Sequence, residues 1–381
     1  MKVLVVSSSF YPKIDGSTRC VYDHARRLAS SGDDVYLATR GMPGIPRSET
    51  IEGIKVRRSS YSFRETSLPN KAALIVEQMI NIFRLQRKFR FSVIHVHGYV
   101  SGLAALPSKY LFRVPVVITT HGTEFLWPRD LWWRTPNQLK LELIFERFVL
   151  KNCDIVIAQS EGVERYMIEL YGSGIKGKIR IVPTGVDQTK FVAVARTRLS
   201  KQVLFVGALS EIKGVSCLLS AFALAHDKYP SSRLRLVGSG PMAKKYKDWV
   251  RERHLESSVD FVGPVRDDTK LLSMYEGSDI VVLPSNVGGP VSCTIMEGLS
   301  CGRAVISTDV PGGIPDILGG GVGLLMRRGD EAQLASMLEE LMADDSFLTE
   351  LGENARRTVE EKYTLDLMVG QLQAVYGEIA G

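Results

Sequence analysis

Short runs of β-branched and other apolar residues alternate along the chain with longer stretches of helical spacing. The runs are Val3–Val6, Val35–Ala38, Val93–His97, Val116–Thr120, Ile155–Ala158, Val203–Val206, Leu234–Val237, Val259–Val262, Ile280–Leu283 and Ala304–Ser307. Most are apolar at successive positions, as in strands that are covered on both faces. Such strands, separated by helices, are typical of βαβ units. The pattern therefore predicts an α/β fold built from doubly wound parallel sheets.

The series of strands is interrupted once, by a polar segment near residues 188–200. A chain of 381 residues is long enough for two hydrophobic cores. We therefore expect two Rossmann-like domains, at 1–188 and 189–361, which face each other across a cleft. Sheets of this class bind their ligands at the carboxyl ends of the strands. The last stretch, 362–381, carries apolar residues at helical spacing and is predicted to be a helix.

The composition is that of an ordinary globular protein, with 45% hydrophobic and 24% charged residues. The five cysteines are scattered and form no CxxC pair, which argues against a disulfide framework or a zinc site. The apolar run after Met1 is short, so we expect a buried strand there and not a secretion signal. No stretch reaches the eighteen apolar residues typical of a membrane span. These features predict a cytoplasmic protein.

The segment Ser285–Gly302 is a glycine-rich loop that leads into a helix and is followed by an apolar strand. Glycines let the backbone approach a ligand, and the first N–H groups of a helix attract anions. Glu297, one turn into the helix, can accept hydrogen bonds from hydroxyl groups. The segment therefore favours a site for a sugar nucleotide. The alternative is a tight loop-helix junction without a ligand.

His121 follows a predicted strand directly and so lies where open α/β sheets place their sites. It is the histidine that we expect to take part in chemistry. His95 and His97 lie in a strand and are expected to pack in the core, whereas the other three, His24, His226 and His254, are expected to be solvated. No two histidines have HExxH spacing, which argues against a metalloenzyme.

Lys213 follows a strand and a glycine turn, Phe205-Val-Gly207, at the start of a helical stretch. A lysine is poorly placed against the helix dipole at that point, so an anion such as a diphosphate is its expected partner. In the first half, Gly16 follows the first strand and allows a phosphate to approach. This region has no GxGxxG motif, which disfavours ordinary dinucleotide binding.

Two basic regions of the first half indicate a surface partner. A helical stretch ends in the cations Arg84, Arg87, Lys88 and Arg90, and an aromatic-basic loop holds Trp127, Arg129, Trp132 and Trp133. Such segments suit a membrane interface or a sugar-binding shelf, although a tryptophan loop can also fill a core. The net charge of +6 and the pI near 9.0 come without a recognisable nucleic-acid module, so we expect no nucleic-acid partner.

Together these segments closely resemble glycosyltransferase family four, whose members have the GT-B fold. Pro183–Phe191 is similar to the family's interdomain signature P-x-G-V-D-x-x-x-F. Lys213, the turn Gly238–Pro241, Glu297 and Gly302 follow in the family's order. The resemblance covers nearly the whole chain.

The resemblance implies a retaining, hexosyltransferase-type enzyme that moves a sugar from a nucleoside-diphosphate sugar to a hydroxyl acceptor, without a metal ion or other cofactor. His121, Lys213 and Glu297 are the catalytic residues that it implies. The implied donor contacts are Gly16, Gly207, Lys213, Gly240, Val265, Gly289, Pro290, Val291, Ser292, Cys293, Thr294 and Glu297. In this picture Lys213 meets the diphosphate, Glu297 the ribose hydroxyls and backbone near Val265 the base. The helix at 362–381 crosses back onto the first, acceptor-side domain.

The chain departs from the family pattern at two positions. Ala208 stands where many members have an arginine, and Gly289 where many have a first glutamate. Losing a charged hydrogen bond of this kind costs on the order of 1.5–3 kcal/mol of binding unless another group replaces it. Two alternatives to a transferase follow: a GT-B nucleotide-sugar epimerase, and a non-catalytic binder of sugar nucleotides.

The acceptor is not specified by these motifs. A polysaccharide, another glycan and a lipid-linked acceptor all fit. The basic helical stretch and the tryptophan loop favour a lipid-linked or membrane-surface acceptor, reached by a protein that binds peripherally to the inner face of the membrane.

Overall fold

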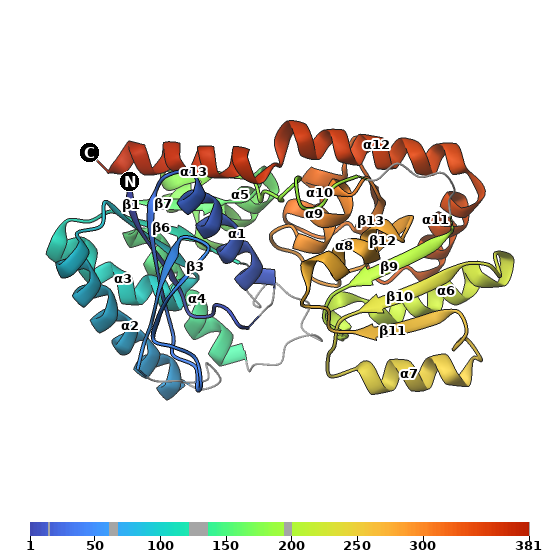
Figure 1. Cartoon of the computed structure of the whole chain (residues 1–381), viewed down its shortest axis with the longest axis horizontal. Helices are drawn as coiled ribbons and strands as arrows, with labels where there is room; N and C mark the ends of the chain where they lie inside the picture. The colour runs from blue at the N-terminus through green and yellow to red at the C-terminus, as the bar shows by residue number, and fades with distance from the viewer. Residues whose placement is uncertain (14–15, 61–67, 122–135, 194–199, 381) are drawn as a thin grey trace. The chain divides into compact units, whose positions relative to one another are not determined.

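A computed structural model describes residues 1–13, 16–60, 68–121, 136–193 and 200–380 of the chain (Figure 1). The chain divides into two compact units. The first holds the described residues of 1–184 together with those from 365 onward, and the second holds 185–364. The division thus falls at 184–185, a few residues before the boundary expected from the sequence.

The first unit is built on an eight-stranded sheet of order β3-β4-β2-β1-β5-β6-β7-β8. Its strands are β1 (Lys2–Ser7), β2 (Asp34–Thr39), β3 (Ser48–Ile51), β4 (Ile54–Arg58), β5 (Val93–His97), β6 (Val116–Thr119), β7 (Ile155–Ala158) and β8 (Ile179–Ile181). Neighbouring strands are parallel except for β3 and β4, which form an antiparallel hairpin at one edge. This sheet is mostly parallel, as the apolar runs predicted.

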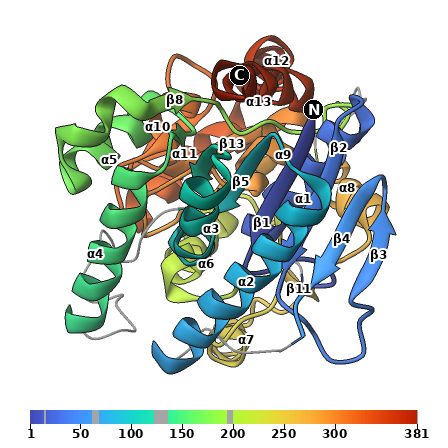
Figure 2. The ribbon, with the colours of Figure 1, turned by 90° about the vertical axis from the view of Figure 1, so that its left-hand side faces the viewer.

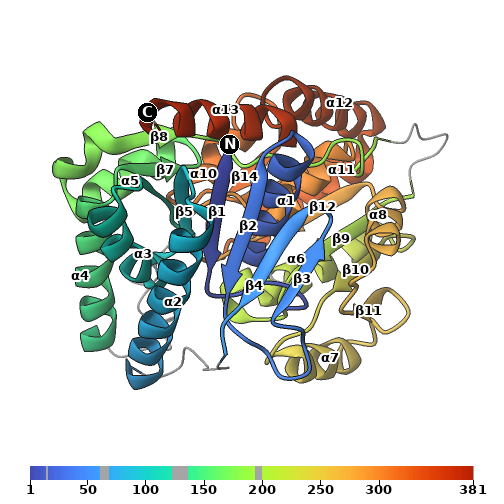
Figure 3. The same cartoon turned by 60° about the vertical axis from the view of Figure 1, so that its left-hand side comes forward.

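Helices cover both faces of this sheet (Figures 2 and 3). One face packs against α2 (Leu68–Phe89), α3 (Tyr99–Phe112), α4 (Pro136–Asn152) and α5 (Glu161–Tyr171). The other packs against α1 (Gly16–Ser30) and α13 (Leu365–Ile379), whose Leu365, Met368 and Leu372 are buried there. The last helix of the chain therefore completes the core of the first unit. A short 3-10 helix, η3 (Ser173–Lys178), precedes β8.

The second unit has a six-stranded, all-parallel sheet of order β11-β10-β9-β12-β13-β14. The strands are β9 (Gln202–Val206), β10 (Arg233–Val237), β11 (Val259–Gly263), β12 (Ile280–Leu283), β13 (Ala304–Thr308) and β14 (Leu324–Met326). The helical segments are η4 (Glu211–Lys213), α6 (Val215–Lys228), α7 (Ala243–Glu252), α8 (Asp268–Glu276), α9 (Cys293–Ser300), α10 (Gly313–Leu318), α11 (Glu331–Ala343) and α12 (Asp345–Lys362). They enclose one continuous core.

Four strands were not predicted from the sequence: β3, β4, β8 and β14. β4 alternates buried and half-buried residues because it lies near the sheet edge, so it lacks a continuous apolar run. β8 and β14 have only three residues each. Among the described helices, none combines the length and the apolar character needed to cross a bilayer.

A glycine sets how closely α3 approaches α4. A Cβ atom at Gly102 would lie 2.4 Å from Cγ1 of Val149, which is fully buried. Valine is stiff about χ1, so relief requires the helices to move apart. We therefore expect Gly102→Ala to lower the free energy of unfolding by about 1–3 kcal/mol and the melting temperature by several degrees.

Gly370→Ala in α13 is the matched control, because no atom lies within 4 Å of a Cβ added there. An exposed helix gains stability from this change, by up to about 1 kcal/mol. Thermal melts of both variants check the prediction, and equal shifts for the two would contradict the packing account.

Candidate active site

The second unit carries a topological switch point between β9 and β12. The chain proceeds from β9 to β10 on one side, whereas β12 lies on the other side of β9 and leads on to β13. In open parallel sheets the crevice outside the carboxyl ends of two such strands is the ligand-binding position. The loops that follow β9 and β12 are therefore the candidate site.

Backbone contacts hold these two loops together. A Cβ atom at Gly214 would lie 1.8 Å from the carbonyl oxygen of Pro284, and Gly214 has φ +68°. The backbone N–H of Asn286 donates to the carbonyl of Ile212 at 2.9 Å, and its side-chain amide donates to the carbonyl of Glu211 at 2.7 Å. Any side chain at 214 would separate the loops. The sequence marked the residues on either loop but did not reveal this contact.

Lys213 lies in this junction, as the last residue of η4. Its side chain is half-buried, and desolvation lowers the pKa of its ammonium group, opposed by the thiol of Cys293 at the start of α9. Among the described residues no carboxylate forms an ion pair with it. A partly desolvated cation without a protein counterion is a favourable partner for an anionic ligand.

The start of α9 adds backbone donors to the same place. Ser292 is the N-cap residue, but its side chain makes no capping hydrogen bond within the described residues. The hydroxyl of Thr294 donates to the carbonyl of Val206 at 3.0 Å, which ties α9 to the end of β9. The proton of Thr294 is therefore already used inside the protein. The positive end of the helix dipole and the N–H groups at the start of α9 favour an anion there.

Glu297 is buried on α9, and one of its carboxylate oxygens accepts a hydrogen bond from the Tyr275 hydroxyl at 2.7 Å. Burial, and then the nearby carboxylate, raises the pKa of Tyr275 well above its ordinary value. The tyrosine stays neutral and holds the carboxylate in place. Tyr275 is a supporting residue that sequence reasoning missed, because nothing in its local pattern links it to Glu297.

Two predicted glycines of the site are explained by contacts within the unit. A Cβ at Gly240 would lie 2.3 Å from the carbonyl oxygen of Leu209, so the loops after β9 and β10 pack backbone against backbone. Gly289 has φ +127° and forms a bridge with Gly312. A glutamate at 289 would be strained in this backbone.

The remaining predicted donor residues fall in or beside the same loops. Gly207 follows β9 directly, and Pro290 and the buried Val291 precede α9. Val265 lies after β11, half-buried against the core of the unit. In the first unit, Gly16 is the exposed first residue of α1. Trp127, Arg129, Trp132 and Trp133 lie outside the described residues.

At the carboxyl edge of the first unit's sheet, His121 pairs with His97. Nε2 of His121 lies 2.9 Å from Nδ1 of His97, with the rings stacked at 5.1 Å between centroids. His97 ends β5 and His121 follows the neighbouring β6. His121 thus lies just after the end of a strand, as expected from the sequence. The buried His97 fixes its orientation.

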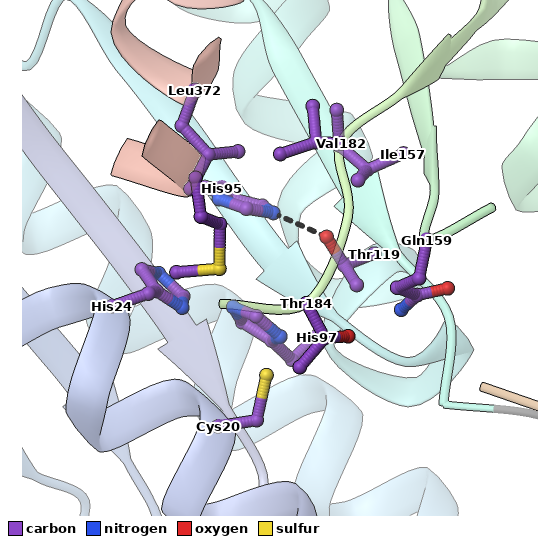
Figure 4. Close-up of a pocket in the computed structure, with 11 residues that line it drawn as sticks. Cys20, His24, His95, His97, Thr119, Ile157, Gln159, Val182, Thr184 and Leu372 are labelled. Atoms are coloured by element: carbon purple, nitrogen blue, oxygen red, sulfur yellow. Dashed lines mark hydrogen bonds between the residues drawn. The ribbon is translucent and has the colours of Figure 1, made fainter. Parts of the chain in front are cut away.

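His24, His95 and His97 line one pocket of the first unit (Figure 4). His24 is 2% exposed, so the prediction that it is solvated was wrong. Its position on α1, between the buried Val21 and Ala25, turns it inward. Burial lowers the pKa of His24 to about 3, and burial also lowers the pKa values of His95 and His97 well below the ordinary value. All three rings are therefore neutral at pH 7.

These three histidines offer nitrogen atoms that lie within 4.8 Å of one another, which raises the question of a metal. Both ring nitrogens of His95 are engaged, by the Tyr376 hydroxyl at 2.6 Å and the Thr119 hydroxyl at 2.8 Å. The three rings are stacked, with interplanar angles of 27–30°. Lone pairs in nearly parallel planes do not converge on one ion. The cluster does not fit a metal centre.

Comparison with known proteins shows the same two-part organisation. Residues 14–190 match the family described as Glycosyltransferase Family 4, and residues 188–358 match Glycosyl transferases group 1. Glycogen synthase of Mycobacterium tuberculosis is 23% identical, covering 99% of this chain and 94% of its own length. D-inositol 3-phosphate glycosyltransferase of Corynebacterium aurimucosum is 27% identical, with 94% of this chain and 90% of its own length covered.

Solved structures share the fold. Sucrose-phosphate synthase from Thermosynechococcus elongatus superposes with a TM-score of 0.85 at 24% identity, covering 99% of this chain and 98% of its own. HepE of Anabaena, solved with UDP and glucose, superposes with a TM-score of 0.76 at 17% identity, covering 99% of each chain. The predicted GT-B fold is thereby confirmed.

The buried histidines make stability depend on pH. The folded pKa of His24 lies below the ordinary value of about 6.5, so the unfolded chain takes up the proton first as the pH falls. Stability is therefore full above about pH 6.5 and declines below it. For His24 alone the loss at pH 5 is about 2 kcal/mol, and His95 and His97 add to it in the same direction.

Melting temperatures between pH 8 and pH 5 test this. His24→Asn removes the titrating ring, so its curve is expected to be flatter than that of the wild type. His254→Asn, at an exposed position, is the control and should follow the wild-type curve. Parallel curves for His24→Asn and the wild type would contradict the account.

Proposed function

This chain belongs to glycosyltransferase family four, and from that membership and the geometry of its second unit we propose that it transfers a sugar from a nucleoside-diphosphate sugar to a hydroxyl acceptor, with retention of the anomeric configuration. The observation that carries the proposal is the junction at the switch point. There a half-buried ammonium group, with no carboxylate partner among the described residues, lies beside the start of a helix whose N-cap side chain makes no capping hydrogen bond within them.

Such a junction suits a diphosphate leaving group. When the bond between the sugar and the diphosphate breaks, negative charge grows on the diphosphate oxygens. A fixed cation and oriented N–H groups lower the energy of that state more than they lower that of the bound donor. Lys213 supplies the cation and the first turn of α9 the N–H groups. The partial desolvation of Lys213 strengthens its attraction to the leaving group.

Because of the two departures from the family pattern, Lys213 is proposed to neutralise more of the diphosphate charge. Ala208 contributes no charge, so Lys213 is proposed to carry the diphosphate with the backbone donors of α9 alone. The sugar hydroxyls, which meet no carboxylate at Gly289, are proposed to bind backbone groups of the same loop. Glu297, held by Tyr275, is proposed to accept from the ribose.

The first unit is proposed to provide the acceptor side. His121, held by His97, is the residue there that we expect beside the transferred sugar, and this role stays a prediction. We propose a lipid-linked acceptor at a membrane surface, supported by the basic helices of that unit.

We expect Lys213→Ala to reduce kcat by about a hundredfold or more, because removing one preorganised charge partner of a leaving group has effects of this size. Release of nucleoside diphosphate from the donor in the presence of acceptor measures it. Lys244→Ala is the matched control, since that lysine is on the same unit with its side chain 91% exposed. Turnover by Lys213→Ala close to that of wild type would refute the assigned role.

Two other outcomes would identify the alternative functions. An epimerised donor recovered without any acceptor would indicate an epimerase. Nucleotide binding without transfer over long incubation would indicate a non-catalytic binder.

A second prediction concerns cofactors. Because Lys213 and backbone N–H groups are proposed to carry the diphosphate charge, transfer should continue in excess EDTA. If EDTA abolished transfer and added Mg²⁺ or Mn²⁺ restored it, this proposal would be contradicted.

A further inference from the structure

The layer of α2, α3 and α4 on the first unit leaves large apolar side chains in contact with solvent. Figure 2 faces this layer. The exposed apolar residues on it are Val76, Ile80, Tyr110, Leu111, Ile144, Phe145 and Phe148. Leu111 is 65% exposed and Phe148 54%. Single exposed apolar residues are common, but a group on adjacent helices indicates an interaction surface.

The helices that carry these side chains are joined by direct contacts. The Tyr110 hydroxyl donates to the side-chain oxygen of Asn152 at 3.3 Å, and Nζ of Lys109 donates to the Asn152 carbonyl at 2.7 Å, which joins the ends of α3 and α4. Phe83 of α2 packs against Phe112 of α3, with the rings tilted by 59° and 4.7 Å between their centroids. α3 therefore contacts both α2 and α4.

Exposed cations lie on the same helices or directly after them. The exposed cations of this helix-layer surface are Arg84, Arg87, Lys88, Arg90, Arg113, Lys140, Arg147 and Lys151. Within the described residues none of them forms an ion pair with a carboxylate. The acidic residues of α4 do not offset them at the surface, because Glu142 pairs with Lys71 and Glu146 is buried.

A simpler explanation covers part of this pattern. Cations near the end of a helix are favoured by its dipole, which accounts for several of those on α2 and for Lys151. It does not account for Lys140, which lies in the first half of α4, nor for Ile144, Phe145 and Phe148 in the middle of that helix.

The surface differs from the one that the sequence indicated. On α2, Ile82 and Leu85 are buried, so the helix with the basic cluster turns part of its apolar side to the core. The contribution of α4 was missed, because its apolar and basic residues follow one another without an obvious amphipathic period.

From these contacts and charges we propose that the helix-layer surface docks on an anionic lipid membrane, with the apolar side chains entering the interface and the cations meeting lipid headgroups. A second copy of this chain fits less well, because a symmetric interface would bring the same cations together. Protein interfaces are also depleted of charge at their centres. Anionic lipid satisfies both kinds of side chain at once.

The proposal names an anionic membrane as the partner of the first unit. Only the lipid-linked nature of the acceptor rests on the proposed function. Vesicle binding is measured without donor or acceptor, so a failure of docking and a failure of transfer are separate results.

The test is flotation of the full chain with vesicles of phosphatidylcholine alone or mixed with phosphatidylglycerol. We expect binding to the anionic vesicles, weakened by salt because the attraction is partly electrostatic. Ile144→Ser combined with Phe148→Ser, and Lys140→Glu combined with Lys151→Glu, should each weaken binding about tenfold or more. Leu224→Ser is the control, an equally exposed apolar residue on α6 of the other unit.

Absence of binding to anionic vesicles would overturn the proposal, as would binding that neither double variant changes. Light scattering of the free protein tests the alternative that this surface binds a second copy of the chain. An oligomer that the Ile144/Phe148 variant dissociates would show that this surface binds a second copy. Unchanged melting temperatures of the variants confirm that the substitutions act at the surface.

Discussion

The candidate site depends on one close approach of two backbones, that of Gly214 to the carbonyl of Pro284. The approach is possible only without a side chain, and the hydrogen bonds from Asn286 to the η4 turn hold it. Through it the loop after β9 and the loop after β12 become one structure. Lys213 and the start of α9 are then parts of a single rigid junction at the switch point, which is what electrostatic preorganisation of a leaving group requires.

Partial burial of a cation gives this junction its chemical character. Lys190 is paired with Asp268 and Lys244 with Asp248. Lys213 is half-buried and forms no ion pair with a carboxylate among the described residues. The fold offsets the cost of its partial desolvation, and under the proposed function a bound diphosphate relieves that cost. Glu297 differs from Lys213, because its buried carboxylate already accepts a hydrogen bond within the protein, from the neutral Tyr275.

Much of this could be predicted from the sequence, and the reasons for the failures are physical. The central strands are apolar on both faces, so their residues alone indicate them, whereas β4 near the sheet edge and the three-residue β8 and β14 carry too little pattern. Lys213 and Glu297 were predicted from the glycine turn and the glycine-rich loop that precede them, and their roles stay predictions. The link of Tyr275 to Glu297 was not found, because tertiary packing makes it. His24 was misplaced although its spacing from Val21 and Ala25 put it on the apolar side of α1.

The central claim is that the junction of Lys213 and α9 binds a nucleoside diphosphate. The most direct measurement is a thermal-shift panel of UDP, GDP, ADP and CMP with their common sugar conjugates, each over a range of concentrations. The account predicts that one nucleoside diphosphate raises the melting temperature. A ligand at a hundred times its dissociation constant stabilises by about 2.7 kcal/mol, which such a melt detects. No shift with any of these nucleotides would contradict the account, because a site for a nucleoside diphosphate should bind at least one member of the panel.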